Sequence, residues 1–326
     1  MGGPAVPGGG REWVVGLVVL AGLAVLPFAV STYWLFVLTE ILIMGLFAMS
    51  YNLLFGVTGL LSFGQAALFG MGAYAAALTL LHGPRSLWLA FGAGVGAAAL
   101  TALVIGYLCV RRDEIFFAML TLGFGMMVFT VAHNWRELTG GSDGLSGFGV
   151  PALEVLGLKV SLFKPRNMYF FTLAVASGGV LVLWRVVRSP FGLILRAARE
   201  NKERLAFVGA DVQRYRLVSF VIAGTLGGLA GVLFCLFNRM ATPDMMHWSF
   251  SAKPVLMTVL GGATVFFGPA FGAAAFFVLE QLTIQVTESW MFVLGLILIP
   301  VVIFFPEGIL GTLVDRVLRR RGAGRG

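Results

Sequence analysis

The stretch LWLAFGAGVGAAALTALVIGYLCV, residues 87–110, decides the fold class, because its 24 residues include no charged side chain. A helix needs about 20 mainly apolar residues to cross the hydrocarbon core of a bilayer. Similar apolar runs recur along the whole chain, and together they predict an all-α polytopic membrane protein with about ten transmembrane helices. The runs are 14–30, 35–55, 60–81, 87–110, 115–132, 169–187, 217–237, 253–267, 269–284 and 290–305. The last three are short, so a re-entrant or broken form stays open for each.

The composition indicates the same class. Hydrophobic residues make up 59% of the 326 residues and charged residues 12%, whereas about a quarter of the residues in a soluble domain are charged. Ten helices take about 200 residues, which leaves no room for a separate soluble domain. The net charge of +8 therefore indicates membrane orientation and not nucleic-acid binding, because a basic nucleic-acid interface needs a soluble face.

The basic residues predict which side of the membrane each segment faces, since cytoplasmic loops are rich in Lys and Arg. With a cytoplasmic N-terminus and an even number of spans, 16 of the 23 basic residues fall on the cytoplasmic side, as do both termini. We expect a disordered cytoplasmic tail (1–12), a transmembrane domain (13–313) and a basic cytoplasmic tail (314–326). Within the domain, 133–167 is expected as a structured external loop and 188–216 as a cytoplasmic segment. The first apolar run is expected to remain as an anchor, with a cleaved signal peptide as the alternative.

The stretch 196–216 is unusually charged for this chain, with nine charged residues, six of them basic, among 21. Ser189 and Pro190 suit the first turn of a helix, Gly209 suits its end, and Asp211 suits the start of the next helix. An apolar stripe predicts one amphipathic helix between these ends; its members are Ile194, Ala197, Ala198, Leu205 and Val208. One interpretation is a solvated helix that serves only membrane orientation. The other is a helix that docks into a groove on a cytoplasmic partner.

The segment YNLLFGVTGLLSFGQAALFG, residues 51–70, breaks an apolar run with glycines and polar uncharged side chains. A helix broken by glycine can line a path for a polar solute while its irregular backbone stays buried in protein. We therefore select four residues as candidates for a translocation pathway: Asn52, Thr58, Ser62 and Gln65. The alternative is a plain helix–turn–helix junction.

Two other features of the predicted spans have open interpretations. Glu40 and Glu280 are costly to expose to lipid. We interpret one as lying near an interface and the other as hydrogen-bonded between helices, with a proton or cation relay as the alternative. Glycines at four-residue spacing let helices approach closely in lipid, so they predict tight packing, with a pore lining as the alternative. The pairs are Gly92/Gly96, Gly224/Gly228, Gly227/Gly231 and Gly268/Gly272.

The sequence shows no recognisable catalytic motif. It lacks HExxH, GxSxG, the phosphate loop GxxxxGK[ST] and paired metal-ligand spacing. His247 is interpreted as a solvated loop residue, and Cys109 and Cys235 as small apolar residues without a disulfide. We expect no metal, no cofactor and no enzymatic activity in this chain, so ATP hydrolysis would need another chain.

Four segments, in this order, resemble those of LivM-type permeases of bacterial branched-chain amino-acid ABC importers. They are NLLFGVTGLLSFGQAALFGMGAY (52–74), RAARENKERLAFVGADVQRYRLVSFVIAGTLGGLAGVL (196–233), VLMTVLGGATVFFGPAFGAAA (255–275) and FVLGLILIPVVIFFPEGILGTL (292–313). The resemblance covers about residues 35–313. It implies a type II-like importer permease fold and a place in the bacterial inner membrane.

The resemblance also implies partners and a role for the charged segment. The partners would be a second homologous permease, two ATP-binding subunits that bind the ATP, and a periplasmic substrate-binding protein. In the family, the segment that matches 196–213 contacts the ATPase. The corresponding coupling residues here are Arg196, Arg199, Glu200, Asn201, Glu203, Arg204 and Gly209.

The expected function is therefore ATP-driven import of branched-chain or related amino acids. Relatives that import urea or short amides share the same motifs, so such a substrate is the first alternative. An ion-coupled secondary transporter or channel that uses Glu40 or Glu280 is an alternative of a different class.

Overall fold

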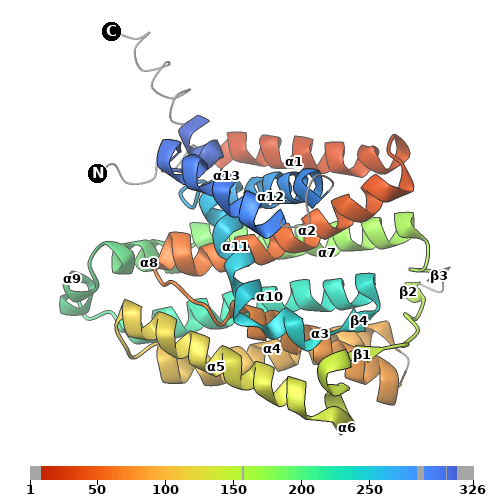
Figure 1. Cartoon of the computed structure of the whole chain (residues 1–326). Helices are drawn as coiled ribbons and strands as arrows, with labels where there is room; N and C mark the ends of the chain where they lie inside the picture. Colours follow the sequence, from red (N-terminus) through yellow and green to blue (C-terminus); the bar gives the residue numbers. More distant parts are fainter. Residues whose placement is uncertain (1–8, 85, 156–157, 285–289, 306, 314–326) are drawn as a thin grey trace.

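The computed structural model describes residues 9–84, 86–155, 158–284, 290–305 and 307–313, which form a bundle of helices with a few short strands (Figure 1). The helices are α1 (Gly9–Val25), α2 (Thr32–Asn52), α3 (Gln65–His82), α4 (Leu87–Cys109), α5 (Glu114–Asn134), α6 (Arg136–Thr139), α7 (Pro165–Arg188), α8 (Pro190–Glu200), α9 (Lys202–Phe207), α10 (Val212–Asn238), α11 (Trp248–Gly261), α12 (Gly268–Ile284) and α13 (Trp290–Phe304). The short helical turns are η1 (Leu26–Phe28), η2 (Leu53–Thr58), η3 (Gly141–Asp143) and η4 (Pro243–Met246). The strands are β1 (Leu145–Ser146), β2 (Leu153–Val155), β3 (Leu158–Val160) and β4 (Met240–Ala241).

Among the described residues, five helical segments are long and apolar enough to cross a membrane. They are Thr32–Thr58, Leu87–Cys109, Glu114–Asn134, Pro165–Arg188 and Val212–Asn238. Two shorter apolar helices span Val18–Phe28 and Gly268–Ile284. These segments confirm the all-α polytopic membrane class. The count of about ten spans stays a prediction.

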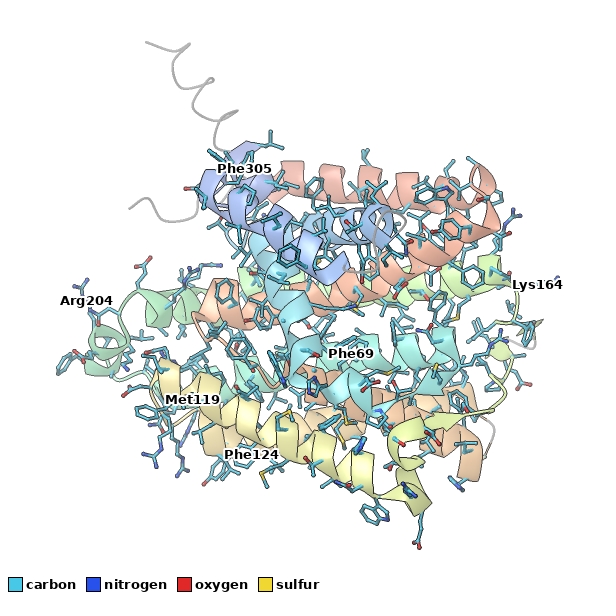
Figure 2. All side chains as sticks on the ribbon, viewed as in Figure 1. Phe69, Met119, Phe124, Lys164, Arg204 and Phe305 are labelled. Atoms are coloured by element: carbon cyan, nitrogen blue, oxygen red, sulfur yellow. The ribbon has the colours of Figure 1, made fainter. Side chains whose placement is uncertain are left out.

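The two ends of the bundle differ in character. At one end, which we call the α9 end, α8 and α9 project beyond the long helices, and the turn between α4 and α5 lies beside them (Figure 1). At the opposite end, the strand end, β1 pairs with β4 and β2 with β3. Figure 2 shows Arg204 at the tip of the α9 end and Lys164 at the strand end. The basic segment 188–216 is thus separated from the segment 133–167, which holds α6, η3 and three of the strands.

Two predicted helix boundaries are wrong by several residues. The run 60–81 predicts a helix from its first residue, but α3 begins only at Gln65. The run 253–267 predicts a helix to its last residue, but α11 ends at Gly261. In both places a glycine adopts a positive φ, +79° at Gly59 and +109° at Gly262, which stops the preceding helix. Hydropathy alone does not detect such stops.

Residues 9–12 of the expected disordered tail, 1–12, belong to α1, which begins at Gly9. Residues 1–8 and the expected basic tail, 314–326, lie outside the described residues.

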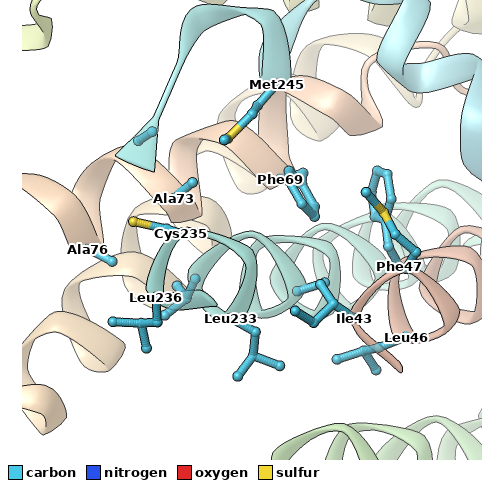
Figure 3. Packing of buried hydrophobic residues seen from close by; sticks show 14 of the residues in the cluster. Ile43, Leu46, Phe47, Phe69, Ala73, Ala76, Leu233, Cys235, Leu236 and Met245 are labelled. Carbon is cyan, nitrogen blue, oxygen red and sulfur yellow. The ribbon is translucent and has the colours of Figure 1, made fainter. Parts of the chain in front are cut away.

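The core forms where α10 contacts α2, α3 and α4. Figure 3 shows buried side chains from three of these helices, among them Phe47 of α2, Phe69 of α3 and Leu233 of α10. The rings of Phe47 and Phe69 lie 4.8 Å apart, and that of Phe250 lies 5.1 Å from Phe69. Aromatic pairs at such distances add to the stability that burial supplies.

Glycines in α10 and α12 let neighbouring helices approach closely. A Cβ atom on Gly231 would overlap the backbone carbonyl of Phe69, and one on Gly272 would overlap that of Met257. The packing interpretation is therefore confirmed for these two helices. For Gly92 and Gly96 of α4 it stays a prediction, because no described atom lies within 4 Å of a Cβ added there.

Candidate coupling site and polar path

The charged segment at the α9 end forms two helices, which corrects the prediction of one helix from Ser189 to Gly209. The predicted start is confirmed, because the Ser189 hydroxyl accepts a hydrogen bond from the Gly192 amide at 3.4 Å, with Pro190 at the first helical position. The break falls at Asn201, whose backbone is extended (φ −159°, ψ 100°). Its side chain then caps α9 by accepting from the Arg204 amide at 2.8 Å.

Because of this break, the predicted apolar stripe divides. On α8, Ala198 of the stripe is buried against the bundle (2% exposed), and so is Leu195 (0% exposed), which the predicted stripe does not include. On α9, Phe207 and Val208 are 91% and 82% exposed, and they lie next to Gly209, whose φ is +90°. The structure thus presents an apolar pair at the tip of a charged projection. The predicted apolar stripe does not include Phe207, because in one continuous helix this residue lies on a different face from the stripe.

The basic side chains of the segment fall into two groups. Arg196 and Arg199 bond inward to backbone carbonyls: Arg196 donates to Val187 at 3.0 Å, and Arg199 donates to Gly56 of η2. Arg199 is itself exposed, as are Glu200, Glu203 and Arg204. The side chains of these last three, however, make no hydrogen bond or ion pair within the described chain. The predicted coupling residues therefore divide into inward-bonded and outward-facing ones.

Lys202 connects α9 to the turn before α5. Its ammonium group lies 2.7 Å from the Asp113 carboxylate and 3.8 Å from that of Glu114, which in turn pairs with Arg216 at 2.7 Å. The hydrogen bond from Lys202, together with its charge, holds the pKa of Asp113 below its ordinary value. The same hydrogen bond raises the pKa of Lys202. Both groups therefore stay charged at neutral pH.

The predicted polar path lies where α2 ends. After Asn52, the six-residue π-helical turn η2 widens the helix, and residues 59–64 form no helix before α3 begins. Figure 1 shows this connection running from the α9 end back into the middle of the bundle. Its residues alternate between half-buried and buried, and an irregular backbone is tolerated at membrane depth where protein covers it.

Three of the four path candidates make hydrogen bonds, although the Oδ1 atom of Asn52 has no partner among the described residues. Asn52 donates to the Ala263 carbonyl at 3.3 Å, and Thr58 bonds with the Ser219 hydroxyl of α10 at 2.8 Å. The Ser62 hydroxyl accepts from the Gly64 amide at 3.4 Å. The first two contacts connect the start of the break to the loop after α11 and to α10, and the third lies within the break.

Gln65, the first residue of α3, differs from the other three candidates. It is 0% exposed, and neither atom of its side-chain amide has a hydrogen-bond partner among the described residues. Its Oε1 atom would lie 3.5 Å from a Cβ added to Gly227, on the α10 side of the path. Leaving a buried amide unpaired costs about 1–3 kcal/mol, so this position is the strongest candidate to meet a polar solute.

The two acids of the predicted spans, Glu40 and Glu280, lie in one cluster. Glu280 of α12 lies 3.7 Å from the ammonium group of Lys253 on α11, and Glu40 of α2 is close enough to both to interact electrostatically. The structure therefore gives Glu280 an ion-pair partner that the sequence prediction missed. Within the described chain, no group of three or more His, Cys, Asp or Glu residues gathers to hold a metal ion.

The chain is similar to known transport permeases. The family model described as "Branched-chain amino acid transport system / permease component" matches residues 33–302. The LivM permease of the Escherichia coli (strain K12) high-affinity branched-chain amino acid transport system is 27% identical, over 99% of this chain and 81% of the relative. The LivH permease of Salmonella typhimurium is 25% identical, over 82% of this chain and 90% of the relative. A chain of PsaBC from Streptococcus pneumoniae, solved in complex with Fab, aligns with 76% of this chain and 90% of its own length at 15% identity, with a TM-score of 0.34.

Proposed function

This chain belongs to the family of branched-chain amino acid transport system permease components, and from this premise we propose that it is one transmembrane subunit of a bacterial ABC importer. The substrate would be a branched-chain or related amino acid. The partners would be a second permease, two ATP-binding subunits and a periplasmic binding protein. Because LivM and LivH relatives both match the chain, a pair of related permeases is the natural arrangement.

The observation that carries the proposal is the apolar pair Phe207–Val208 on the projecting helix α9. An aromatic residue so fully exposed within a charged segment is typical of an anchor that fills a pocket on a partner. The exposed charged residues Glu200, Glu203 and Arg204 lie in the same segment and would form a polar rim. In our proposal α9 faces the cytoplasm, where the ATP-binding subunits are, and the basic segments at this end follow the positive-inside rule. The protein would then lie in the inner membrane with both termini in the cytoplasm.

A reconstitution experiment tests this function. The chain, its partner permease and the two ATP-binding subunits are placed in liposomes, the binding protein is added outside, and uptake of labelled leucine is measured. We expect uptake that requires ATP and all the partners. Uptake of labelled urea or acetamide, without uptake of leucine, would show that the substrate is urea or a short amide. Uptake by the purified chain alone, driven by a proton or sodium gradient, would contradict the proposal and favour ion coupling through Glu40 or Glu280.

A substitution tests whether Gln65 lines the translocation path. Gln65→Leu removes a buried amide that has no partner, so we expect the free energy of unfolding to stay the same or to rise. Transport should nevertheless fall, by roughly tenfold in leucine kcat/KM, because a polar solute would lose a contact of about 1.4 kcal/mol. The measurement is ATP-driven leucine uptake over a range of substrate concentrations.

Thr172→Val is the matched control for this substitution. Thr172 of α7 is also 0% exposed with an unpaired side-chain oxygen, but it lies on a different helix from the break. If Gln65→Leu impaired uptake no more than Thr172→Val does, Gln65 would be only a structural residue.

A further inference from the structure

The π-helical turn η2 is connected to three other parts of the chain. Asn52, just before it, bonds to the loop between α11 and α12, and Thr58, at its end, bonds to Ser219 of α10. The third connection is to α8: Arg199 donates to the Gly56 carbonyl. Short π-helical segments are rare and often occur at functional sites. Here the segment lies at a junction between the projecting helices and the broken helix.

The bond from Arg199 satisfies a specific need of this turn. The last carbonyl groups of a helix have no partner within the helix, and they carry partial negative charge. Gly56 lies three residues before Gly59, where the turn ends in a left-handed conformation. A guanidinium group at this place supplies both a donor and a positive charge, and its planar shape fixes the direction of the bond.

The aliphatic part of Arg199 is fitted to the same turn. A Cβ atom on Gly59 would lie 2.7 Å from Cγ of Arg199, so only glycine leaves room for the arginine stem. The positive φ of Gly59, +79°, favours glycine as well. The arginine therefore has a seat on η2 formed by Gly56 and Gly59.

Apolar contacts tie α8 to the turn around this seat. Leu195 of α8 and Leu53 and Leu54 of η2 belong to one buried cluster, and none of them is more than 1% exposed. In contrast, the other connection of this segment, from Lys202 to Asp113, is 40% and 72% exposed at its two side chains. Exposed ion pairs contribute little stability, so α8 holds more firmly to η2 than α9 holds to α5.

We propose that Arg199 is a positioning residue that transmits the movement of α8 to the broken helix, and that it is not a contact to the partner. This inference rests on the proposed function, because the movement would come from ATP-binding subunits docked on α9. A displacement of α8 would shift η2, and residues 59–64 would carry the shift to the start of α3. The path residue Gln65 lies at that point.

The ratio of leucine imported to ATP hydrolysed tests the inference in the reconstituted importer. In Arg199→Met, which keeps the apolar stem and removes the guanidinium group, we expect a normally assembled complex that still hydrolyses ATP. Its uptake per ATP should fall at least tenfold. Arg199→Lys keeps a charge at the end of η2 but loses the planar group, so an intermediate ratio is expected.

Arg204→Met is the matched control, since Arg204 is an exposed arginine on α9. We expect it to change the affinity for the ATP-binding subunits and to leave the ratio unchanged. An unchanged ratio of leucine imported to ATP hydrolysed in Arg199→Met would overturn the inference. Loss of both complex assembly and ATP hydrolysis would also overturn it, because Arg199 would then be a docking residue. If Arg199→Met reduced the amount of folded chain, the ratio in Arg199→Lys would decide: a lowered ratio supports the inference and a wild-type ratio overturns it. Absence of ATP-driven uptake in the wild-type complex would contradict the proposed function instead.

Discussion

Phe207→Asp is expected to weaken binding of the ATP-binding subunit to the permease by about 100-fold. Truncating an aromatic anchor at the centre of an interface costs about 2 kcal/mol or more, and a buried carboxylate adds a desolvation cost. A loss of about 2.7 kcal/mol corresponds to the 100-fold change. The affinity is measured between the purified permease pair in detergent and the isolated ATP-binding subunit.

Phe163→Asp serves as the control for this result. Phe163 is 69% exposed, and it lies beside Lys164 at the strand end, far from α9. The same change there should leave the affinity for the ATP-binding subunit unchanged. Wild-type affinity in Phe207→Asp would show that the tip of α9 is not the docking surface.

Lys253→Met is expected to lower the free energy of unfolding by about 3 kcal/mol, because it leaves Glu280 without its ion-pair partner. The side chain of Glu280 is only 10% exposed and that of Lys253 28% exposed, so water compensates for little of the loss. Denaturant titration of the purified chain in detergent micelles measures the change.

The double variant Lys253→Met/Glu280→Gln distinguishes two causes of a loss of stability: an unpaired charge at Glu280, and the changed shape of the side chain at position 253. Removing both charges should restore most of the stability, since neutral groups of similar size replace a buried pair with little cost. If the single variant were as stable as the wild type, the pair would contribute nothing to folding. ATP-driven leucine uptake by the stable double variant would also show that transport needs no ion relay at Glu280.

The sequence was sufficient to predict the class of the fold and several exact local features. Apolar runs locate the long helices because a bilayer demands length and hydropathy together. Helix caps are equally local, so Ser189 at the start of α8 and Asp211, which accepts from the Arg214 amide at 3.2 Å before α10, could be identified from single residues. Both kinds of signal depend on neighbours within a few positions.

What the sequence could not predict depends on contacts between distant segments. Asn201 is a common N-cap residue, but asparagine is also tolerated within helices, so this residue alone does not distinguish one helix from two. The break exists where α8 packs on the bundle and α9 turns away. The partner of Glu280 is likewise 27 positions away, on another helix. The roles proposed for Gln65 and Arg199 depend on the course that η2 and residues 59–64 take through the bundle, and hydropathy does not predict that course.

The two connections of the projecting segment respond differently to ionic strength. The screening length falls from about 8 Å at physiological salt to about 3 Å at 1 M, so the exposed pair of Lys202 and Asp113 weakens in concentrated salt. The seat of Arg199 on η2 is held by a backbone carbonyl and by apolar packing, which concentrated salt does not screen in this way. Concentrated salt should therefore loosen α9 from α5 while α8 stays in place, and the projecting segment would pivot at Asn201.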